Sequence, residues 1–168
     1  MGRVLVTGMS GTGKSTLIAA LAARGCEAVD ADTDEYSEWA AVGGEDAAGT
    51  PVEPGRDWQW REDRIAALLA AERAGPLFLA GCAANMGRFL PQFDRVILLR
   101  APAAIIVERL AARTGNDYGK GPGETERVLG LIQTVEPLLR HIATHEIDTA
   151  ASLDEVAATV LRIAESII

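Results

Sequence analysis

Residues 3–16 of the 168-residue chain read Arg-Val-Leu-Val-Thr-Gly-Met-Ser-Gly-Thr-Gly-Lys-Ser-Thr. Residues 3–7 are mostly β-branched or aliphatic, which predicts a short strand. Gly8 to Ser15 match the pattern G-x-x-x-x-G-K-[ST] at every position, and a helix is expected to follow as far as about Arg24. A strand, a glycine-rich loop and a helix in this order predict a phosphate-binding loop.

Each residue type in this loop suits the binding of a nucleotide. Glycines allow consecutive backbone N–H groups to turn toward one phosphate, and the helix presents its positive end to the same anion. Lys14 would supply positive charge to the β and γ phosphates, and Ser15 a hydroxyl to Mg²⁺. The loop therefore predicts binding of ATP or GTP through Gly8, Met9, Ser10, Gly11, Thr12, Gly13, Lys14, Ser15 and Thr16.

Strands and helices alternate beyond the loop. Further strands are expected at 27–29, 76–80, 94–100 and 145–148. Helices are expected through Trp39, at 58–74 and at 103–113. Another is expected from 124, bent or restarted near Pro137, and a last one from a capping box at Ser152 and Glu155 to the end. This alternation predicts an α/β protein, residues 1–168 forming one domain with helices on both faces of a parallel sheet.

Composition excludes several kinds of partner. The formal charge of −8 and the pI near 4.8 disfavour nucleic acid, because its phosphates are normally bound by a basic face. No apolar run approaches the roughly 20 residues that a membrane span needs. The N-terminal stretch lacks the layout of a secretory signal. We therefore expect a cytoplasmic protein, monomeric or homodimeric, with neither nucleic acid nor membrane as a partner.

The other strand ends separate the classes of protein that share this loop. A motor ATPase carries an acidic residue at a strand end, but the strand at 76–80 continues into Gly81 and Cys82, and the strand at 94–100 ends in arginine. A GTPase needs Asn-Lys-x-Asp to read guanine, and neither Asn85 nor Asn116 is followed by lysine. Both classes fit poorly, which leaves the small-molecule kinases.

At three places the chain resembles small phosphate-binding-loop kinases of the nucleoside monophosphate kinase and shikimate kinase group. These are residues 8–16, the acidic residues 30–34, and residues 94–102 followed by Glu-Arg-Leu-Ala-Ala-Arg at 108–113. The resemblance covers essentially the whole chain. It implies a five-stranded sheet in the order 2-3-1-4-5, a kinase that uses ATP and Mg²⁺, an acceptor-binding insert at about 33–74 and a lid at about 109–123.

Two sets of charged residues are candidates for catalysis. Arg109 and Arg113 are four apart and so share one helix face, before a glycine-rich stretch; the resemblance makes them lid arginines that contact ATP and the transferred phosphoryl group. Asp30, Asp32 and Asp34 follow the second strand, where ligands bind in open parallel sheets. In shikimate-kinase-like proteins an aspartate pair at this place serves both Mg²⁺ and the acceptor hydroxyl. Asp32 belongs to both possible pairs and is our first choice for both roles.

The acceptor region is acidic and rich in tryptophan. Residues 27–63 hold twelve acidic and two basic side chains, a net charge of −10, which opposes a phosphorylated acceptor. Trp39, Trp58 and Trp60 flank this insert, either as a wall for a planar or apolar acceptor or as packing for the insert. We expect a hydroxyl acceptor that is a small, neutral or cationic metabolite. A nucleoside monophosphate kinase and a slowly hydrolysing regulatory module remain as alternatives. The acceptor contacts are expected from Asp32, Asp34, Trp58, Arg61, Gly81 and Asn85.

Overall fold

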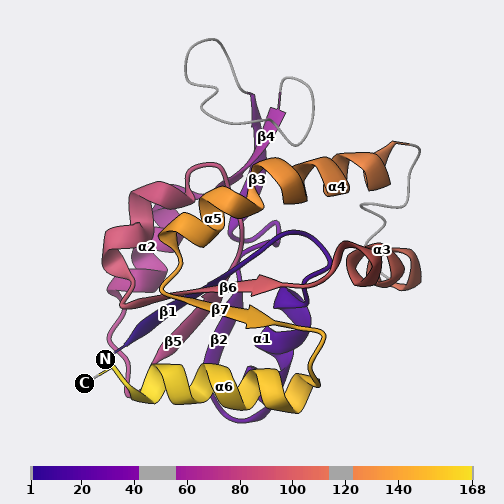
Figure 1. Cartoon of the computed structure of the whole chain (residues 1–168). Coiled ribbons are helices and arrows are strands. Elements are labelled where there is room, and N and C mark those ends of the chain that lie inside the picture. The colour runs from indigo at the N-terminus through magenta and orange to yellow at the C-terminus, as the bar shows by residue number, and fades with distance from the viewer. Residues whose placement is uncertain (1, 42–55, 114–122, 168) are drawn as a thin grey trace.

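A five-stranded sheet forms the centre of the protein (Figure 1). It is seen in a computed structural model that describes residues 2–41, 56–113 and 123–167. The strands are β1 (Arg3–Thr7), β2 (Glu27–Asp30), β5 (Leu77–Ala80), β6 (Arg95–Arg100) and β7 (His145–Asp148). They lie in the order β2-β5-β1-β6-β7, and all neighbours are parallel. Counted among these strands alone, this is the predicted order 2-3-1-4-5.

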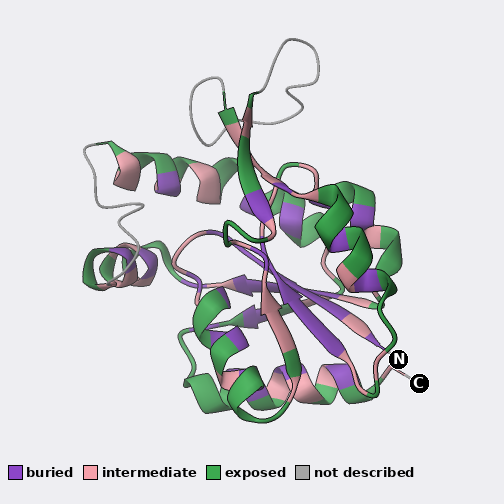
Figure 2. Cartoon of the chain, turned by 180° about the vertical axis from the view of Figure 1, so that it is seen from behind, coloured by how far each residue is buried: buried purple, intermediate pink, exposed green. Residues whose placement is uncertain are grey.

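Helices cover both faces of the sheet because side chains alternate along each strand. Val4 and Val6 of β1 belong to an apolar cluster with α1 (Lys14–Ala23) and α6 (Leu153–Glu165). Leu5 points the other way, into a cluster with α2 (Glu62–Ala70) and α5 (Glu136–Ile142). Figure 2 shows the buried strands between helices whose outer sides are exposed. The predicted three-layer arrangement is confirmed.

The remaining helices follow β6. α3 (Ala103–Ala112) and α4 (Glu124–Thr134) share a small apolar cluster through Ile106, Leu110 and Val128. Pro137 lies in the first turn of α5, where its missing N–H is tolerated, so the predicted break near Pro137 is confirmed. The predicted capping box of α6 is also confirmed, because Ser152 and Glu155 bind each other's backbone. No described helix is long and apolar enough to cross a membrane.

Two predicted helices in the insert are wrong in whole or in part. The segment through Trp39 is a strand, β3 (Ser37–Ala41), and pairs antiparallel with β4 (Arg56–Trp60). The helix predicted at 58–74 is reduced to α2, because residues 56–60 alternate with a period of two and place Trp58 opposite Trp39. The helical spacing of Ile65, Leu68 and Leu69 corresponds to a helix only from residue 62 onward. The glycines and prolines of residues 43–55 also predict a loop, and these residues lie outside the described part of the chain.

Candidate active site

The loop after β1 has the backbone shape that phosphate binding requires. Gly11 and Gly13 have φ values of 82° and 97°, in the region that glycine adopts most easily. A Cβ at Gly8 would lie 2.4 Å from the carbonyl oxygen of Leu99, so only glycine fits between β1 and β6. α1 begins directly at Lys14 and has no acidic residue in its first turn. The positive end of the helix therefore faces the loop without a competing carboxylate from that turn.

Lys14 is held over the loop rather than extended into solvent. Its Nζ donates to the carbonyl oxygens of Gly8 at 2.7 Å and Met9 at 3.2 Å, and the residue is only 8% exposed. The same Nζ lies 4.0 Å from Oδ2 of Asp32. The lysine charge is thus fixed between the loop and the end of β2, where a nucleotide phosphate and a second substrate would meet.

Ser15 and Asp30 form a pair of oxygen ligands at the start of α1. The Ser15 hydroxyl donates to Oδ2 of Asp30 at 2.5 Å. The other oxygen of Asp30 accepts from the backbone N–H of Asp32 at 2.9 Å, which fixes the carboxylate at the end of β2. A hydroxyl and a carboxylate oxygen suit Mg²⁺, which typically takes few protein ligands and completes its shell with water and phosphate. No larger group of metal ligands is found among the described residues.

Asp32 contacts the hairpin of β3 and β4 and the end of β5. Its Oδ1 accepts from Nε1 of Trp58 and from the backbone N–H of Cys82, both at 3.3 Å. Desolvation by burial raises the pKa of Asp32, with the charge of Asp30 acting in the same direction and Lys14 acting against it. The side chain nevertheless keeps 27% of its surface exposed. A carboxylate with a raised pKa that a small molecule can still reach is suited to accept a proton.

The three tryptophans do not share one role. Trp60 is 2% exposed and packs on Phe89, inside the core cluster below the hairpin. Trp39 and Trp58 lie opposite each other on the two strands, with ring centres 5.1 Å apart in an edge-on arrangement. Trp39 is 37% exposed and Trp58 is bonded to Asp32. One tryptophan therefore anchors the hairpin, and two form an accessible aromatic pair beside Asp32.

Asn85 and Gly81 lie under this hairpin. The Asn85 side chain accepts from the Trp60 N–H at 2.8 Å and donates to the Trp60 carbonyl at 2.9 Å, as a strand partner would. A Cβ at Gly81 would lie 3.0 Å from Nε1 of Trp60, so glycine lets the indole sit against the end of β5. In this structure, both predicted acceptor contacts support the hairpin.

The bonds of Asn85 give a prediction about stability. Asn85→Ala leaves the Trp60 N–H and carbonyl at the hairpin base without these partners, so we expect the free energy of unfolding to fall by about 1–3 kcal/mol. Urea unfolding followed by tryptophan fluorescence measures the change. Gln92→Ala, at an exposed position, is the control and should stay within about 0.5 kcal/mol of wild type. Equal midpoints for the two variants would contradict the assignment.

Arg61 and Asp34 lie on the outer side of the insert. Nε of Arg61 donates to the carbonyl oxygen of Asp34 at 3.1 Å, and NH1 binds Glu38 at 2.7 Å. The Asp34 carboxylate is on an exposed residue two positions beyond Asp32. Neighbouring arginines are used in the same way: Arg64 donates to the Glu35 carbonyl and Arg88 to Glu62. These guanidinium groups hold the acidic segment in place.

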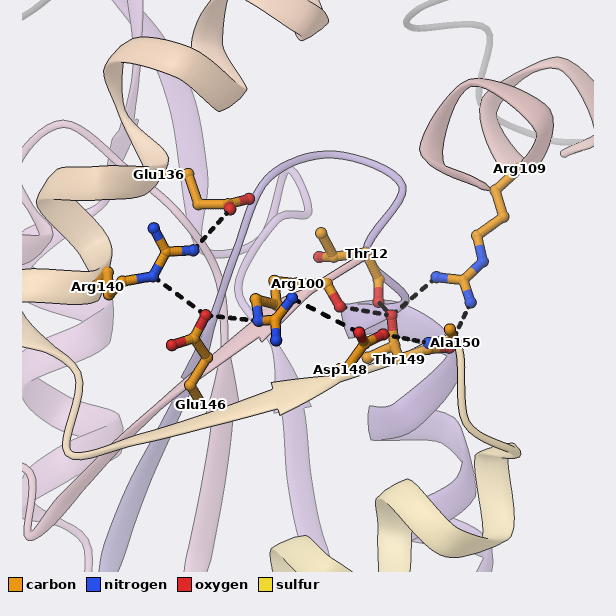
Figure 3. Close-up of polar contacts among 9 residues, drawn as sticks. All are labelled: Thr12, Arg100, Arg109, Glu136, Arg140, Glu146, Asp148, Thr149 and Ala150. Atoms are coloured by element: carbon orange, nitrogen blue, oxygen red, sulfur yellow. Dashed lines mark hydrogen bonds and ion pairs between the residues drawn. The ribbon is translucent and has the colours of Figure 1, made fainter. Parts of the chain in front are cut away.

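Arg109 reaches back from α3 to the phosphate-binding loop. Its guanidinium donates to the carbonyl oxygen of Gly11, to the Thr149 hydroxyl at 2.9 Å and to the Thr149 carbonyl at 2.5 Å. The Thr149 hydroxyl in turn donates to the Thr12 carbonyl at 2.7 Å, as Figure 3 shows. Arg109 thus joins the loop to the segment after β7. Arg113 directly follows α3, and the rest of the predicted lid up to residue 122 lies outside the described residues.

Some residues of this region were not anticipated from the sequence. Thr149 follows β7, the last strand. Its contact with Thr12 depends on the order of the parallel strands in the folded sheet, which the spacing of residues along the chain does not show. Glu136 begins α5 and is buried, yet in the sequence it looks like an ordinary acidic residue in the first turn of a helix. Asp32 was the first choice from the sequence, and the contact of Asp30 with Ser15 could not be read from it.

A parallel sheet in this order, with a phosphate-binding loop after its central strand, is the fold of the small P-loop kinases. A family model described as an AAA domain matches residues 4–130, and the chain belongs to that family. A search of the curated proteins finds no match.

Solved kinases have the same fold over almost the whole chain. A shikimate kinase from Acinetobacter baumannii in complex with shikimate is 21% identical with a TM-score of 0.65, covering 99% of this chain and 94% of that one. A gluconokinase from Sinorhizobium meliloti is 21% identical with a TM-score of 0.58, covering 98% and 94%. A shikimate kinase from Bacteroides thetaiotaomicron is 18% identical with a TM-score of 0.65, covering 98% of each chain.

Proposed function

We propose that the protein is an ATP-dependent kinase that transfers the γ-phosphate of Mg-ATP to a hydroxyl of a small, non-phosphorylated metabolite. The observation that carries the proposal is the position of Asp32. Its carboxylate lies 4.0 Å from Nζ of Lys14 and accepts a hydrogen bond from Trp58 of the hairpin. The Ser15 hydroxyl donates to Asp30 instead. Two carboxylates with different partners support two separate roles, one toward the metal and one toward the acceptor.

The residues of the loop would bind and orient the nucleotide. Backbone N–H groups at the start of α1 would hold the phosphates, and Lys14 would turn from the Gly8 and Met9 carbonyls to the β and γ phosphates. Ser15 and Asp30 would hold Mg²⁺, which neutralises charge on the phosphates when bound. In this proposal Asp30 replaces our first choice, Asp32, as the acidic residue on the metal side.

Asp32 would accept the proton of the acceptor hydroxyl. As the new bond between the acceptor oxygen and the γ phosphorus forms, the bond from that phosphorus to the β–γ bridging oxygen breaks and ADP leaves. The hydroxyl proton passes to the Asp32 carboxylate, whose pKa is raised mainly by burial. Arg113, at the end of α3, is the proposed source of further positive charge for the transferred phosphoryl group.

The charges around the hairpin support an acceptor without a phosphate group. Arg61, Arg64 and Arg88 are bonded to carbonyl or carboxylate oxygens of the insert. A dianionic acceptor would have to take these arginines from their partners beside residues 27–63, a segment of net charge −10. The accessible pair of Trp39 and Trp58 instead offers aromatic surface to a planar or apolar group.

A coupled assay of ADP release tests the proposal. ATP and Mg²⁺ are offered with nucleosides, sugars, cyclitols, aminated alcohols and the four common nucleoside monophosphates. We expect turnover to rise sharply with one non-phosphorylated acceptor. Preference for AMP, CMP, UMP or dTMP would establish a nucleoside monophosphate kinase instead, and slow hydrolysis indifferent to every metabolite would establish a regulatory module.

The proposed roles of the two aspartates, Asp30 toward Mg²⁺ and Asp32 toward the acceptor, can be tested separately. Asp30→Asn weakens the metal side, so we expect the Mg²⁺ concentration for half-maximal rate to rise about 10- to 100-fold. Asp32→Asn should leave that concentration within about twofold while lowering the rate, because Asp32 contacts Trp58 of the hairpin and its proposed role is on the acceptor side. Titration of Mg²⁺ at saturating ATP measures both. The assignment fails if the Mg²⁺ requirement shifts with Asp32→Asn and not with Asp30→Asn.

A further inference from the structure

Glu136 is a buried carboxylate with one oxygen left over. The residue is 7% exposed and starts α5. Its Oε1 accepts from NH2 of Arg140 at 3.1 Å, whereas Oε2 has no hydrogen-bond donor among the described residues. Burial of a carboxylate oxygen without a donor is unfavourable. Because this oxygen has almost no exposed surface, a ligand that brings a donor reaches it only when the Glu136 side chain turns toward that ligand.

Glu136 is also one member of a chain of ion pairs that, among the described residues, has one more carboxylate than guanidinium group. Arg140 binds both Glu136 and Glu146, and Glu146 in turn binds Arg100 at 2.6 Å. Arg100 also reaches Asp148 at 3.6 Å. Figure 3 shows this chain running from α5 across the ends of β6 and β7. In the part of the chain that the structure describes, three carboxylates share two guanidinium groups, and the buried oxygen without a donor is at the Glu136 end.

The position of Glu136 relates it to the acceptor side of the sheet. The ion pairs link it to Arg100 and Asp148, the last residues of β6 and β7, which end at the same sheet edge as β1 and its loop. The next turn of α5 places Leu139 in the apolar cluster that holds Trp60 and Met9. The start of α5 therefore lies on the face of the sheet that the hairpin covers. It also lies at the edge where β2 ends, two residues before Asp32.

We propose that Glu136 binds a cationic amino group of the acceptor, so that the substrate is an amino alcohol or an aminated sugar or cyclitol. This inference rests on the proposed kinase function and names its substrate class. One hydroxyl of the acceptor reacts beside Asp32. The ammonium group donates to Oε2 of Glu136 and supplies the missing positive charge, while the body of the molecule lies near Trp58. The exposed arginines of the insert take no part in this recognition.

Matched pairs of acceptors test the substrate class with the wild-type protein. D-glucosamine is compared with D-glucose, and 1-amino-1-deoxy-scyllo-inositol with scyllo-inositol, in the ADP-release assay. We expect kcat/KM to be about 10- to 100-fold higher for the amino member of each pair that turns over, as a charge-assisted hydrogen bond gives. Preference for the hydroxyl members would overturn the inference and leave the kinase intact. Absence of turnover with every member would count against both.

Substitution of Glu136 identifies the residue responsible. Glu136→Gln keeps the shape and removes the charge, so we expect kcat/KM for the amino member to fall about 10- to 100-fold and that for the hydroxyl member to change less than about twofold. Glu165→Gln, at the exposed end of α6, is the control for loss of one negative charge and should change neither. Equal losses with both members of a pair would make Glu136 purely structural. If Glu136→Gln does not fold, the wild-type comparison still decides the substrate class.

Discussion

Asp32→Asn is expected to lower kcat for the best acceptor by about 10²- to 10⁴-fold, the usual contribution of a positioned acid or base. Asparagine keeps an oxygen for Trp58 Nε1 and the Cys82 N–H, so the hairpin should stay in place. The substitution removes the site that accepts the hydroxyl proton. Steady-state rates at saturating ATP measure the effect, and Asp154→Asn, on the opposite side of the sheet, is the control. A loss of less than about threefold would rule out Asp32 as the base.

The same substitution should make the protein more stable at neutral pH. Burial raises the pKa of Asp32 above 3.8, so the folded protein holds this proton more tightly than the unfolded chain does. Above the raised pKa the carboxylate is ionised in both states, and its desolvation destabilises the fold. Asp32→Asn removes that cost, which predicts a higher Tm. The advantage should shrink as pH falls through the raised pKa and vanish below 3.8.

Higher stability combined with lost activity is the result that separates a functional carboxylate from a structural one. A structural Asp32 would lose stability on substitution, because the attraction between its negative charge and Lys14 would then be its purpose, and asparagine removes that charge. Thermal unfolding at several pH values therefore gives a readout independent of any acceptor. A lower Tm for Asp32→Asn at neutral pH would contradict the proposed role even before an acceptor is known.

The fold could be predicted because its signals are local or strictly periodic. The loop at 8–15 has a fixed spacing, and the strand at 94–100 is buried on both faces, so neither depends on distant contacts. The hairpin could not be predicted in the same way. Its strands pair through Trp39 and Trp58, nineteen positions apart in the chain, and such pairing outweighs weak helical spacing in either strand.

The site was predictable in residue type more than in role. The loop residues have roles that follow from the motif. Among Asp30, Asp32 and Asp34 the spacing favours Asp32 for both roles, whereas the side-chain contacts divide the roles between Asp30 and Asp32. Arg61 is predicted as an acceptor contact, and the sequence does not show that its guanidinium binds the Asp34 carbonyl and the Glu38 carboxylate. A role that depends on a partner from another strand can be predicted only when the pairing register of the strands is known. That register could not be derived from the sequence.

Lys14→Met is expected to lower kcat by about 10³-fold, because phosphoryl transfer depends on positioned positive charge near the β and γ phosphates. Methionine fills the space but cannot replace the Nζ contacts with Gly8 and Met9. Lys14→Arg is the matched variant that keeps the charge. We expect it to lose nearly as much, because the buried site between the loop and Asp32 is shaped for a compact ammonium group.

The residual activity of Lys14→Met should also report the coupling between Lys14 and Asp32. Lys14 lowers the pKa of Asp32 against the effect of burial, so its removal should raise that pKa further. Because the carboxylate form accepts the proton, activity falls as pH decreases through this pKa, and the acid limb of kcat/KM should lie at higher pH in Lys14→Met than in wild type. Lys14→Arg should leave the limb closer to its wild-type position. An acid limb unchanged in Lys14→Met would mean that the titrating base is a group other than Asp32.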